Sequence, residues 1–261
     1  MTSLRRNGLL FLCILFTAVF LSCFVGVFSV QHTPLSLVLG TVYVAVGSVV
    51  VALLPAYLMA GVLSQALKFA PWLHRLISYA VFLLAGMPSI IYGVIGFALF
   101  CQLLGFGWSI LSATLTLALM LVPTLATGLV QVFKPMVDRF EPLNRTLGIG
   151  PASFLFFWIP KLRGPSILAL MQLGWSRAVA DTAAVMLTCG VVMEMPLSVY
   201  DSVRVISYHI YLLAMEEPGG LPEARTLSML LVVVLIALNL VSQRLGAALF
   251  KESESWSLAA I

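Results

Sequence analysis

The chain has 261 residues, of which 61% are hydrophobic and only 9% are charged, with a formal net charge of +4. Soluble domains are about 45–50% apolar and about 25% charged, so this chain has too few charges to cover a water-facing surface. The composition excludes disordered proteins, disulfide scaffolds and almost any soluble enzyme, and predicts an all-α, polytopic membrane protein. The basic excess is typical of cytoplasmic membrane-protein loops, and with no nucleic-acid-binding motif we expect no nucleic-acid partner.

Six apolar stretches are long enough to cross a bilayer, since a span needs about 20 apolar residues. In chain order they cover about residues 8–30, 35–67, 76–104, 109–133, 165–193 and 226–245. The first stretch is longer than the core of a signal peptide and no small-residue cleavage site follows it, so we expect a retained anchor. We expect one transmembrane domain over 1–261, with its core at 35–248.

The basic residues predict the orientation of these spans, because cytoplasmic loops carry an excess of Lys and Arg. With six spans, one side holds eleven of them: Arg5, Arg6, Lys68, Arg75, Lys134, Arg139, Arg145, Lys161, Arg163, Arg244 and Lys251. The other side holds Arg204 and Arg225. We therefore expect both termini in the cytoplasm. The cytoplasmic loop 134–163 is too short for an ATPase and long enough to dock against one.

The usual enzyme motifs are missing from the sequence. It contains no Gly-Lys-Ser/Thr triplet, no His-Glu-x-x-His and no Gly-x-Ser-x-Gly. Ser89 with His74 or His209 would suit an intramembrane protease, but the histidines are expected at other depths than Ser89. The four cysteines, all in apolar runs and expected as buried free thiols, are Cys13, Cys23, Cys101 and Cys189. We expect no catalytic residue, no cofactor and no metal.

Arg177 and Asp181 are ionisable residues well inside the predicted fifth span. They are four residues apart, on one helical face, and can pair. Ionisable groups at membrane depth are costly and usually face a bundle interior or a wet path. The pair either fixes helix packing or lines a translocation path. We favour the path, where a guanidinium would match an oxyanion in a bidentate way.

The stretch Ala85–Gly96 in the predicted third span places a proline between glycines. Such a proline breaks the regular helix and frees backbone groups that neighbours must satisfy in lipid. We therefore expect this face to be buried. The local chemistry alone fits both a packing kink and a gate.

Ala85–Gly96 resembles the signature of the permease subunits of phosphate ABC importers, the Pst system, and the A-type is more similar than the C-type. Gly40-Thr41-Val42-Tyr43 is similar to that family's Gly-Thr-Leu-Tyr, and Ser176–Ala183 is similar to its Gly-Arg-Ala-Ile-Gly-Glu-Thr-Ala. The resemblance implies six transmembrane helices in the type I ABC-importer (MetI-like) fold and a transport subunit that does not hydrolyse ATP. The implied substrate-path residues are Arg177, Asp181, Thr182, Pro88, Ser89 and Tyr92.

The resemblance also implies partners in a bacterial inner membrane: a second permease subunit, two ATP-binding subunits, an extracytoplasmic phosphate-binding protein and membrane lipid. Such permeases carry a cytoplasmic loop with a glutamate nineteen residues before a proline. Glu141 and Pro160 keep that spacing, while Gly148 lies seven residues after the glutamate where six is usual. The implied ATPase-coupling residues are Glu141, Gly148, Phe156, Phe157, Trp158 and Pro160.

Other interpretations stay open at this point. The coupling loop departs from the family pattern, so a poorly coupled permease fits too, and its apolar run also suits a helix in the membrane interface. The substitutions around Arg177 fit another oxyanion. A stand-alone secondary transporter or channel is the alternative from another class; it typically has inverted repeats, and we find one Gly/Pro-interrupted span without a repeat partner.

Overall fold

The computed structural model describes residues 35–64 and 71–258, and every regular element within these ranges is a helix. The expected first span, with Arg5, Arg6 and Lys68, lies outside the described residues. In chain order the elements are α2 (Leu35–Leu63), α3 (Pro71–Ala85), α4 (Ser89–Gly96), η1 (Phe97–Leu103), α5 (Ile110–Thr146), α6 (Pro151–Ser153), η2 (Phe154–Trp158), α7 (Ile159–Ala180), α8 (Ala183–Thr188), α9 (Ile206–Met215) and α10 (Leu221–Leu258). The expected all-helical class is confirmed for this part of the chain.

Three helical stretches among the described residues are long and apolar enough to cross a membrane: Leu35–Leu63, Ile110–Phe140 and Pro151–Ala180. A fourth candidate is the pair Pro71–Ala85 and Ser89–Leu103, if the two helices count as one span. These candidates overlap the expected second to fifth spans, but the last one lies earlier in the chain than the expected 165–193, because its helix ends at Ala180. The multi-pass character of the chain is therefore supported, and the total of six spans stays a prediction.

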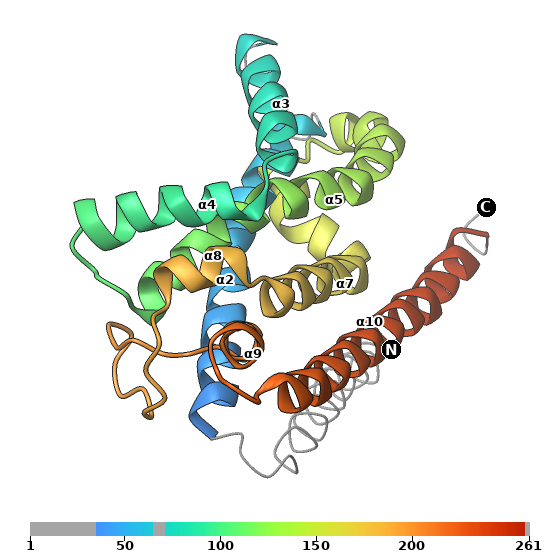
Figure 1. Ribbon diagram of the computed structural model, residues 1–261. Helices are drawn as coiled ribbons and strands as arrows, with labels where there is room; N and C mark the ends of the chain where they lie inside the picture. Colours follow the sequence, from blue (N-terminus) through green and yellow to red (C-terminus); the bar gives the residue numbers. More distant parts are fainter. Residues whose placement is uncertain (1–34, 65–70, 259–261) are drawn as a thin grey trace.

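The expected third span is bent by 106° between α3 and the α4–η1 helix. As a result α3 stands out from the body of the molecule while α4 lies across it (Figure 1). Pro88 takes an extended conformation with ψ 144° directly before α4. The Gly-Pro stretch breaks the helix as expected, and the expected third span therefore consists of two helices.

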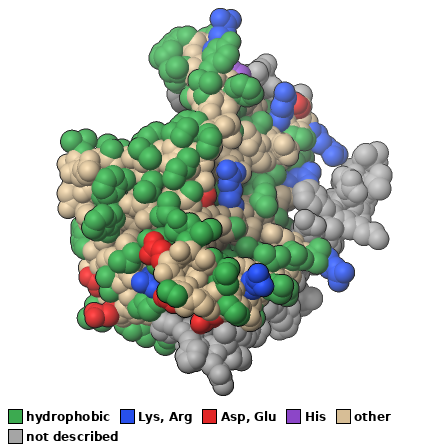
Figure 2. All heavy atoms as spheres, viewed as in Figure 1, with side chains coloured by type: hydrophobic (Ala, Val, Ile, Leu, Met, Phe, Trp, Pro, Cys, Tyr) green, Lys and Arg blue, Asp and Glu red, His purple; other side chains and the backbone are tan. Residues whose placement is uncertain are grey.

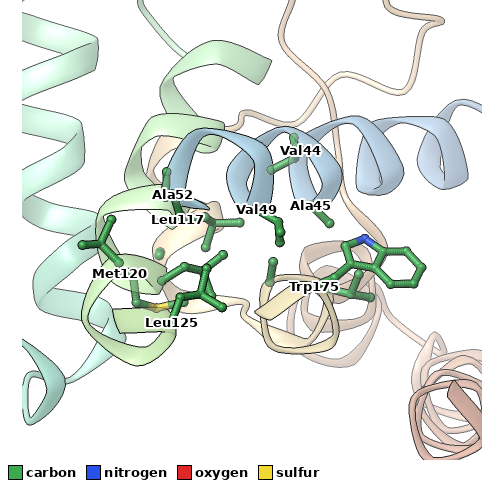
Figure 3. Packing of buried hydrophobic residues seen from close by; sticks show 14 of the residues in the cluster. Val44, Ala45, Val49, Ala52, Leu117, Met120, Leu125 and Trp175 are labelled. Carbon is green, nitrogen blue, oxygen red and sulfur yellow. The ribbon is translucent and has the colours of Figure 1, made fainter. Parts of the chain in front are cut away.

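The core lies where α2 crosses α5 and α7. Figure 3 shows side chains of α2, α5 and α7 converging there: Val44, Ala45, Val49 and Ala52 from α2, Leu117, Met120 and Leu125 from α5, and Trp175 from α7. Small residues bring the backbones together, since a Cβ added to Gly47 would lie 3.0 Å from the Thr114 side chain. Gly47 therefore allows α2 and α5 to pack closely.

The segment 189–205 covers the beginnings of α2 and α5. The backbone N–H of Ile110 donates to the Asp201 carbonyl at 3.0 Å. At α2, Thr41 Oγ1 accepts the N–H of Ile206 at 3.0 Å, and a Cβ on Gly40 would lie 3.2 Å from the Arg204 carbonyl oxygen. The Gly-Thr pair of the sequence motif is thus the place where this segment is fastened to α2.

The other end of α2 contacts the segment that follows α5. The Tyr57 hydroxyl donates to the Leu155 carbonyl at 2.7 Å. Tyr57 is sixteen residues after Thr41 and therefore lies about 24 Å farther along the axis of α2. The expected cytoplasmic loop 134–163 is largely helical, because α5 continues to Thr146 and helical structure resumes at Pro151. Only residues 147–150 form a turn.

Hydrophobic side chains cover much of the face shown in Figure 2, over α3 and α4 in particular. The exposed ones include Tyr79, Phe82 and Leu83 of α3 and Ile90 and Val94 of α4. A continuous apolar surface of this kind suits lipid or another membrane helix.

Candidate functional site

Arg177 lies in the last turn of α7 and reaches across to α5. Its Nη1 atom donates a hydrogen bond of 2.7 Å to Thr124 Oγ1. The arginine side chain is otherwise exposed on the surface of this chain. A guanidinium has five N–H donors, so this contact orients the group and leaves it able to bind an anion.

Asp181 does not pair with Arg177, although the spacing of four predicts that contact in a continuous helix. Helix α7 ends at Ala180, and Asp181 has an extended backbone with ψ 129°. Its Oδ1 atom accepts the backbone N–H of Ala184 at 2.9 Å, at the start of α8. The carboxylate satisfies the new helix end, which is a common use of aspartate, and the expected ion pair is therefore wrong.

Tyr92 stabilises the bend between α3 and α4. Its side chain is only 1% exposed, and its hydroxyl donates to the Leu84 carbonyl at 2.6 Å. That carbonyl is in the last turn of α3, where it also accepts the Met87 N–H at 3.2 Å. Pro88 is exposed and Ser89 is half-buried, so the expected burial of this face holds for Tyr92 and not for the proline.

The two sequence motifs meet where α4 packs on α8. A Cβ added to Gly93 would lie 2.9 Å from Ala184 Cα and 3.1 Å from the Ala183 carbonyl oxygen. Thr182, half-buried, directly precedes α8. The fold thus brings α4, which carries Tyr92, against α8, which begins directly after Thr182 and six residues after Arg177.

A cavity of about 560 Å³ lies beside this region, between α5, α7 and α10. Polar and apolar side chains line it: Gly128, Gln131, Val132, Pro135, Arg163, Ser166, Ala169, Leu170, Leu173 and Asn239. Four of these ten residues, Gln131, Arg163, Ser166 and Asn239, have polar side chains, so the cavity can hold water.

Whole-sequence comparison agrees with the resemblance of the motifs. The chain is 24% identical over 170 residues to the phosphate transport system permease protein PstA 1 of Mycobacterium tuberculosis H37Rv, covering 64% of this chain and 55% of that protein. Identity is 27% over 208 residues to the phosphate transport system permease protein PstC of Haemophilus influenzae (68% and 65% covered). It is 22% over 186 residues to the probable ABC transporter permease protein YqgI of Bacillus subtilis (65% and 63% covered).

The chain is similar to phosphate-transport permeases. The expected resemblance is confirmed, and PstA-type proteins are slightly favoured. The chain spans between 55% and 65% of the lengths of the three relatives. No family model matches it.

The expected ATPase-coupling residues lie around the turn between α5 and α6. Glu141 is in the last part of α5, and Gly148 has φ +68°, a conformation that favours glycine. Phe157 is 74% exposed and Trp158 is also exposed, so both are accessible to a partner. Pro160 follows them at the start of α7.

Phe156 differs from its two neighbours because it also packs inside this chain. Its ring stacks on Tyr57 with centroids 5.8 Å apart, and Tyr57 contacts Phe133 edge-on at 4.8 Å. The preceding Leu155 is fully buried. One side of this aromatic run is therefore fixed to α2 while Phe157 and Trp158 face outward.

The histidines have partners other than Ser89. His74 Nε2 is 3.4 Å from the Leu63 carbonyl oxygen. His209, only 5% exposed in α9, has its Nδ1 atom 3.4 Å from Arg204 Nη1. Burial lowers the pKa of His209 below its ordinary value, and the Arg204 cation lowers this pKa further, whereas Glu217 and Glu223 act in the opposite direction.

Sequence reasoning missed two residues that organise these regions, Thr124 and Tyr57. Thr124 follows Pro123 in the middle of an apolar run, and such a polar side chain beside a proline is the signal that could have indicated it. Tyr57 has a similar position two residues after Pro55. Cys101 and Cys189 are buried free thiols, as expected.

Proposed function

We propose that this chain is a permease subunit of an ATP-driven phosphate importer in a bacterial inner membrane. The observation that carries the proposal is the exposed Arg177 guanidinium of α7, which is hydrogen-bonded to Thr124 of α5 one helical turn from a cavity lined by polar and apolar side chains. A planar guanidinium binds tetrahedral oxyanions through two parallel hydrogen bonds. Two of the relatives named above are phosphate-transport permeases, which supports phosphate as the substrate.

In this proposal the chain has six spans in the type I importer fold, with both termini in the cytoplasm. It forms the path with a second permease subunit, receives phosphate from an extracytoplasmic binding protein and leaves ATP hydrolysis to two partner subunits. The distribution of basic residues supports this orientation. The separation of segment 189–205 from segment 151–158, at opposite ends of α2, also supports it.

The substrate path in this proposal passes the region where α4 meets α8. Arg177 binds the anion, and the helix break at Asp181 follows it by four residues, where the Asp181 carbonyl accepts the Ser207 hydroxyl at 2.9 Å. The bend at Pro88 and Ser89 and the buried Tyr92 hold α4 against α8. Broken helices of this kind are tolerated at membrane depth where they are buried or line a cavity, which supports the assignment.

The segment Glu141–Pro160 docks in a groove of the ATP-binding subunit in this proposal. Exposed aromatic side chains are typical anchors of such interfaces, and Phe157 and Trp158 are exposed. Phe156 stacks on Tyr57, so a displacement of the docked segment would reach α2 directly.

Phosphate uptake in a strain lacking this chain tests the proposal. Uptake should be lost on deletion and restored by the wild type. Arg177→Lys keeps the charge and removes the planar fork, so this variant should reach the membrane at wild-type levels and take up little phosphate. Uptake that survives in Arg177→Lys and in the double variant Arg177→Gln, Asp181→Asn would contradict the assigned site.

Competition experiments with sulfate and molybdate test whether the transported substrate is phosphate or another oxyanion. Sulfate or molybdate that abolishes phosphate uptake at equimolar concentration would favour a permease for another oxyanion. A stand-alone transporter or channel would retain uptake when the ATP-binding subunit is inactivated, whereas the importer would lose it. Neighbouring reading frames for an ATPase and a second permease favour the importer.

A further inference from the structure

A polar contact joins α5 to α7 at a depth where membrane helices usually carry apolar side chains. Arg177 Nη1 and Thr124 Oγ1 are 2.7 Å apart, the short distance typical of a charge-assisted hydrogen bond. Thr124 lies fourteen positions after Ile110, the first residue of α5, and ten before Lys134, its first charged residue. At 1.5 Å per residue these two residues are about 21 Å and about 15 Å away along the axis. The contact therefore lies well inside the apolar part of α5.

The Thr124 hydroxyl is used differently from those of its neighbours in α5. Thr116 donates to the Ser112 carbonyl at 2.7 Å, and Thr127 donates to the Thr124 carbonyl at 2.9 Å, which is the common pattern for helical threonine. Thr124 instead accepts a hydrogen bond from a cation. A hydroxyl has one donor and two acceptor lone pairs, so Thr124 can hold the guanidinium and still donate to an anion.

The cavity described above begins one helical turn from this contact. Gly128, four residues after Thr124, and Leu173, four residues before Arg177, both line it. Residues four apart lie on the same face of a helix. The contact therefore lies at one end of a cavity that follows the facing sides of α5 and α7 and has both polar and apolar side chains in its lining.

We propose that Thr124 and Arg177 together bind a tetrahedral oxyanion. Arg177 donates through guanidinium N–H groups other than the one directed at Thr124, and Thr124 donates through its hydroxyl while it fixes the orientation of the guanidinium. Two donors from two helices define the position of the anion, which a single flexible arginine does not. The inference deepens the proposed function and rests on it for the identity of the anion, inorganic phosphate.

Three variants separate the hydroxyl from the rest of the side chain. Thr124→Val keeps the shape and removes the hydroxyl, whereas Thr124→Ser keeps the hydroxyl. Thr127→Val is the matched control, one turn along the same helix, where the hydroxyl bonds only the backbone. We expect Thr124→Val to raise the KM for phosphate uptake about tenfold, the loss of one hydrogen bond to a charged group, with a retained maximal rate. Thr124→Ser and Thr127→Val should stay within about twofold of the wild type.

Direct binding separates this inference from the proposed function. Line broadening of the phosphorus NMR signal of inorganic phosphate by the purified full-length chain reports binding, with sulfate and molybdate as competitors. Wild-type uptake with an unchanged KM and unchanged broadening in Thr124→Val would overturn the inference and leave the importer intact. Broadening that depends on Thr124, without any phosphate uptake in cells, would support the oxyanion site and contradict the importer. Absence of both broadening and competition in the wild type would overturn the site.

Discussion

The contact between α4 and α8 predicts that an added methyl group at Gly93 destabilises the protein. A Cβ there would lie 2.9 Å from Ala184 Cα, 3.0 Å from Leu187 Cδ1 and 3.1 Å from the Ala183 carbonyl oxygen. Two of these atoms belong to the backbone of α8, so a side-chain rotation cannot relieve the overlap. We expect Gly93→Ala to push the helices apart.

The magnitude follows from two opposing effects. Overpacking a close contact costs about 1–3 kcal/mol. Replacing a helical glycine with alanine gains about 0.5–1 kcal/mol, because alanine loses less backbone entropy. The control for added volume is Gly164→Ala, at the kink between Arg163 and Pro165 in α7, where an added Cβ has nothing within 4 Å. The difference between the variants isolates the overpacking cost, which is about 2 kcal/mol and corresponds to a melting-temperature difference of about 4–8 °C.

Thermal unfolding of both variants in the same detergent measures this difference. Gly164→Ala should match or slightly exceed the wild type, and Gly93→Ala should melt lower. Equal melting temperatures for the two variants would refute the reasoning, since the approach of α4 to α8 would then be looser than the structure has it.

Three further predictions concern the bend, the outer histidine and the turn after α5. Tyr92→Phe removes the 2.6 Å hydrogen bond to the Leu84 carbonyl, which keeps the Met87 N–H as a partner, and should lower stability by about 0.5–1.5 kcal/mol in thermal melts, whereas Tyr79→Phe, at a 68% exposed position, should change little. The pKa of His209 in the folded protein is lowered below 6.5, so the unfolded chain binds more protons than the folded protein just below pH 6.5. The free energy of unfolding should therefore fall as the pH falls below 6.5 and stay level above it. His209→Gln should flatten this slope in thermal melts at stepped pH. Gly148 has φ +68°, so Gly148→Val should reduce co-purification of the ATP-binding subunit and phosphate uptake, while Gly148→Asn, which tolerates this conformation, should retain both; equal behaviour of the two would remove the role of this turn.

The sequence predicts the helix break before Ser89 but not the angle between the two helices. The Gly-Met-Pro stretch before Ser89 indicates a break, and the structure has one. The angle of 106° depends on the Tyr92 hydroxyl reaching Leu84 and on the fit of Gly93 against Ala184, contacts between residues that no local pattern relates.

The candidate site shows the same limit at Arg177. The spacing to Asp181 predicts a pair only if the helix continues, and the helix ends after Ala180 because the Asp181 carboxylate binds the next helix instead. The actual partner, Thr124, is 53 residues away in sequence. Packing across the whole bundle decides which faces of two spans contact each other. Local residue spacing in a single sequence does not predict such contacts.

The fastened ends of α2 give this helix a mechanical role. Thr41 Oγ1 accepts a hydrogen bond from the N–H of Ile206, the residue that follows segment 189–205. About 24 Å farther along the axis of α2, the Tyr57 hydroxyl donates to the Leu155 carbonyl. An α-helix is stiff along its length and is packed here against α5 and α7. α2 therefore connects the two ends of the bundle mechanically. We expect a displacement of Leu155 to be transmitted along α2 to Ile206 by a route that does not include Arg177.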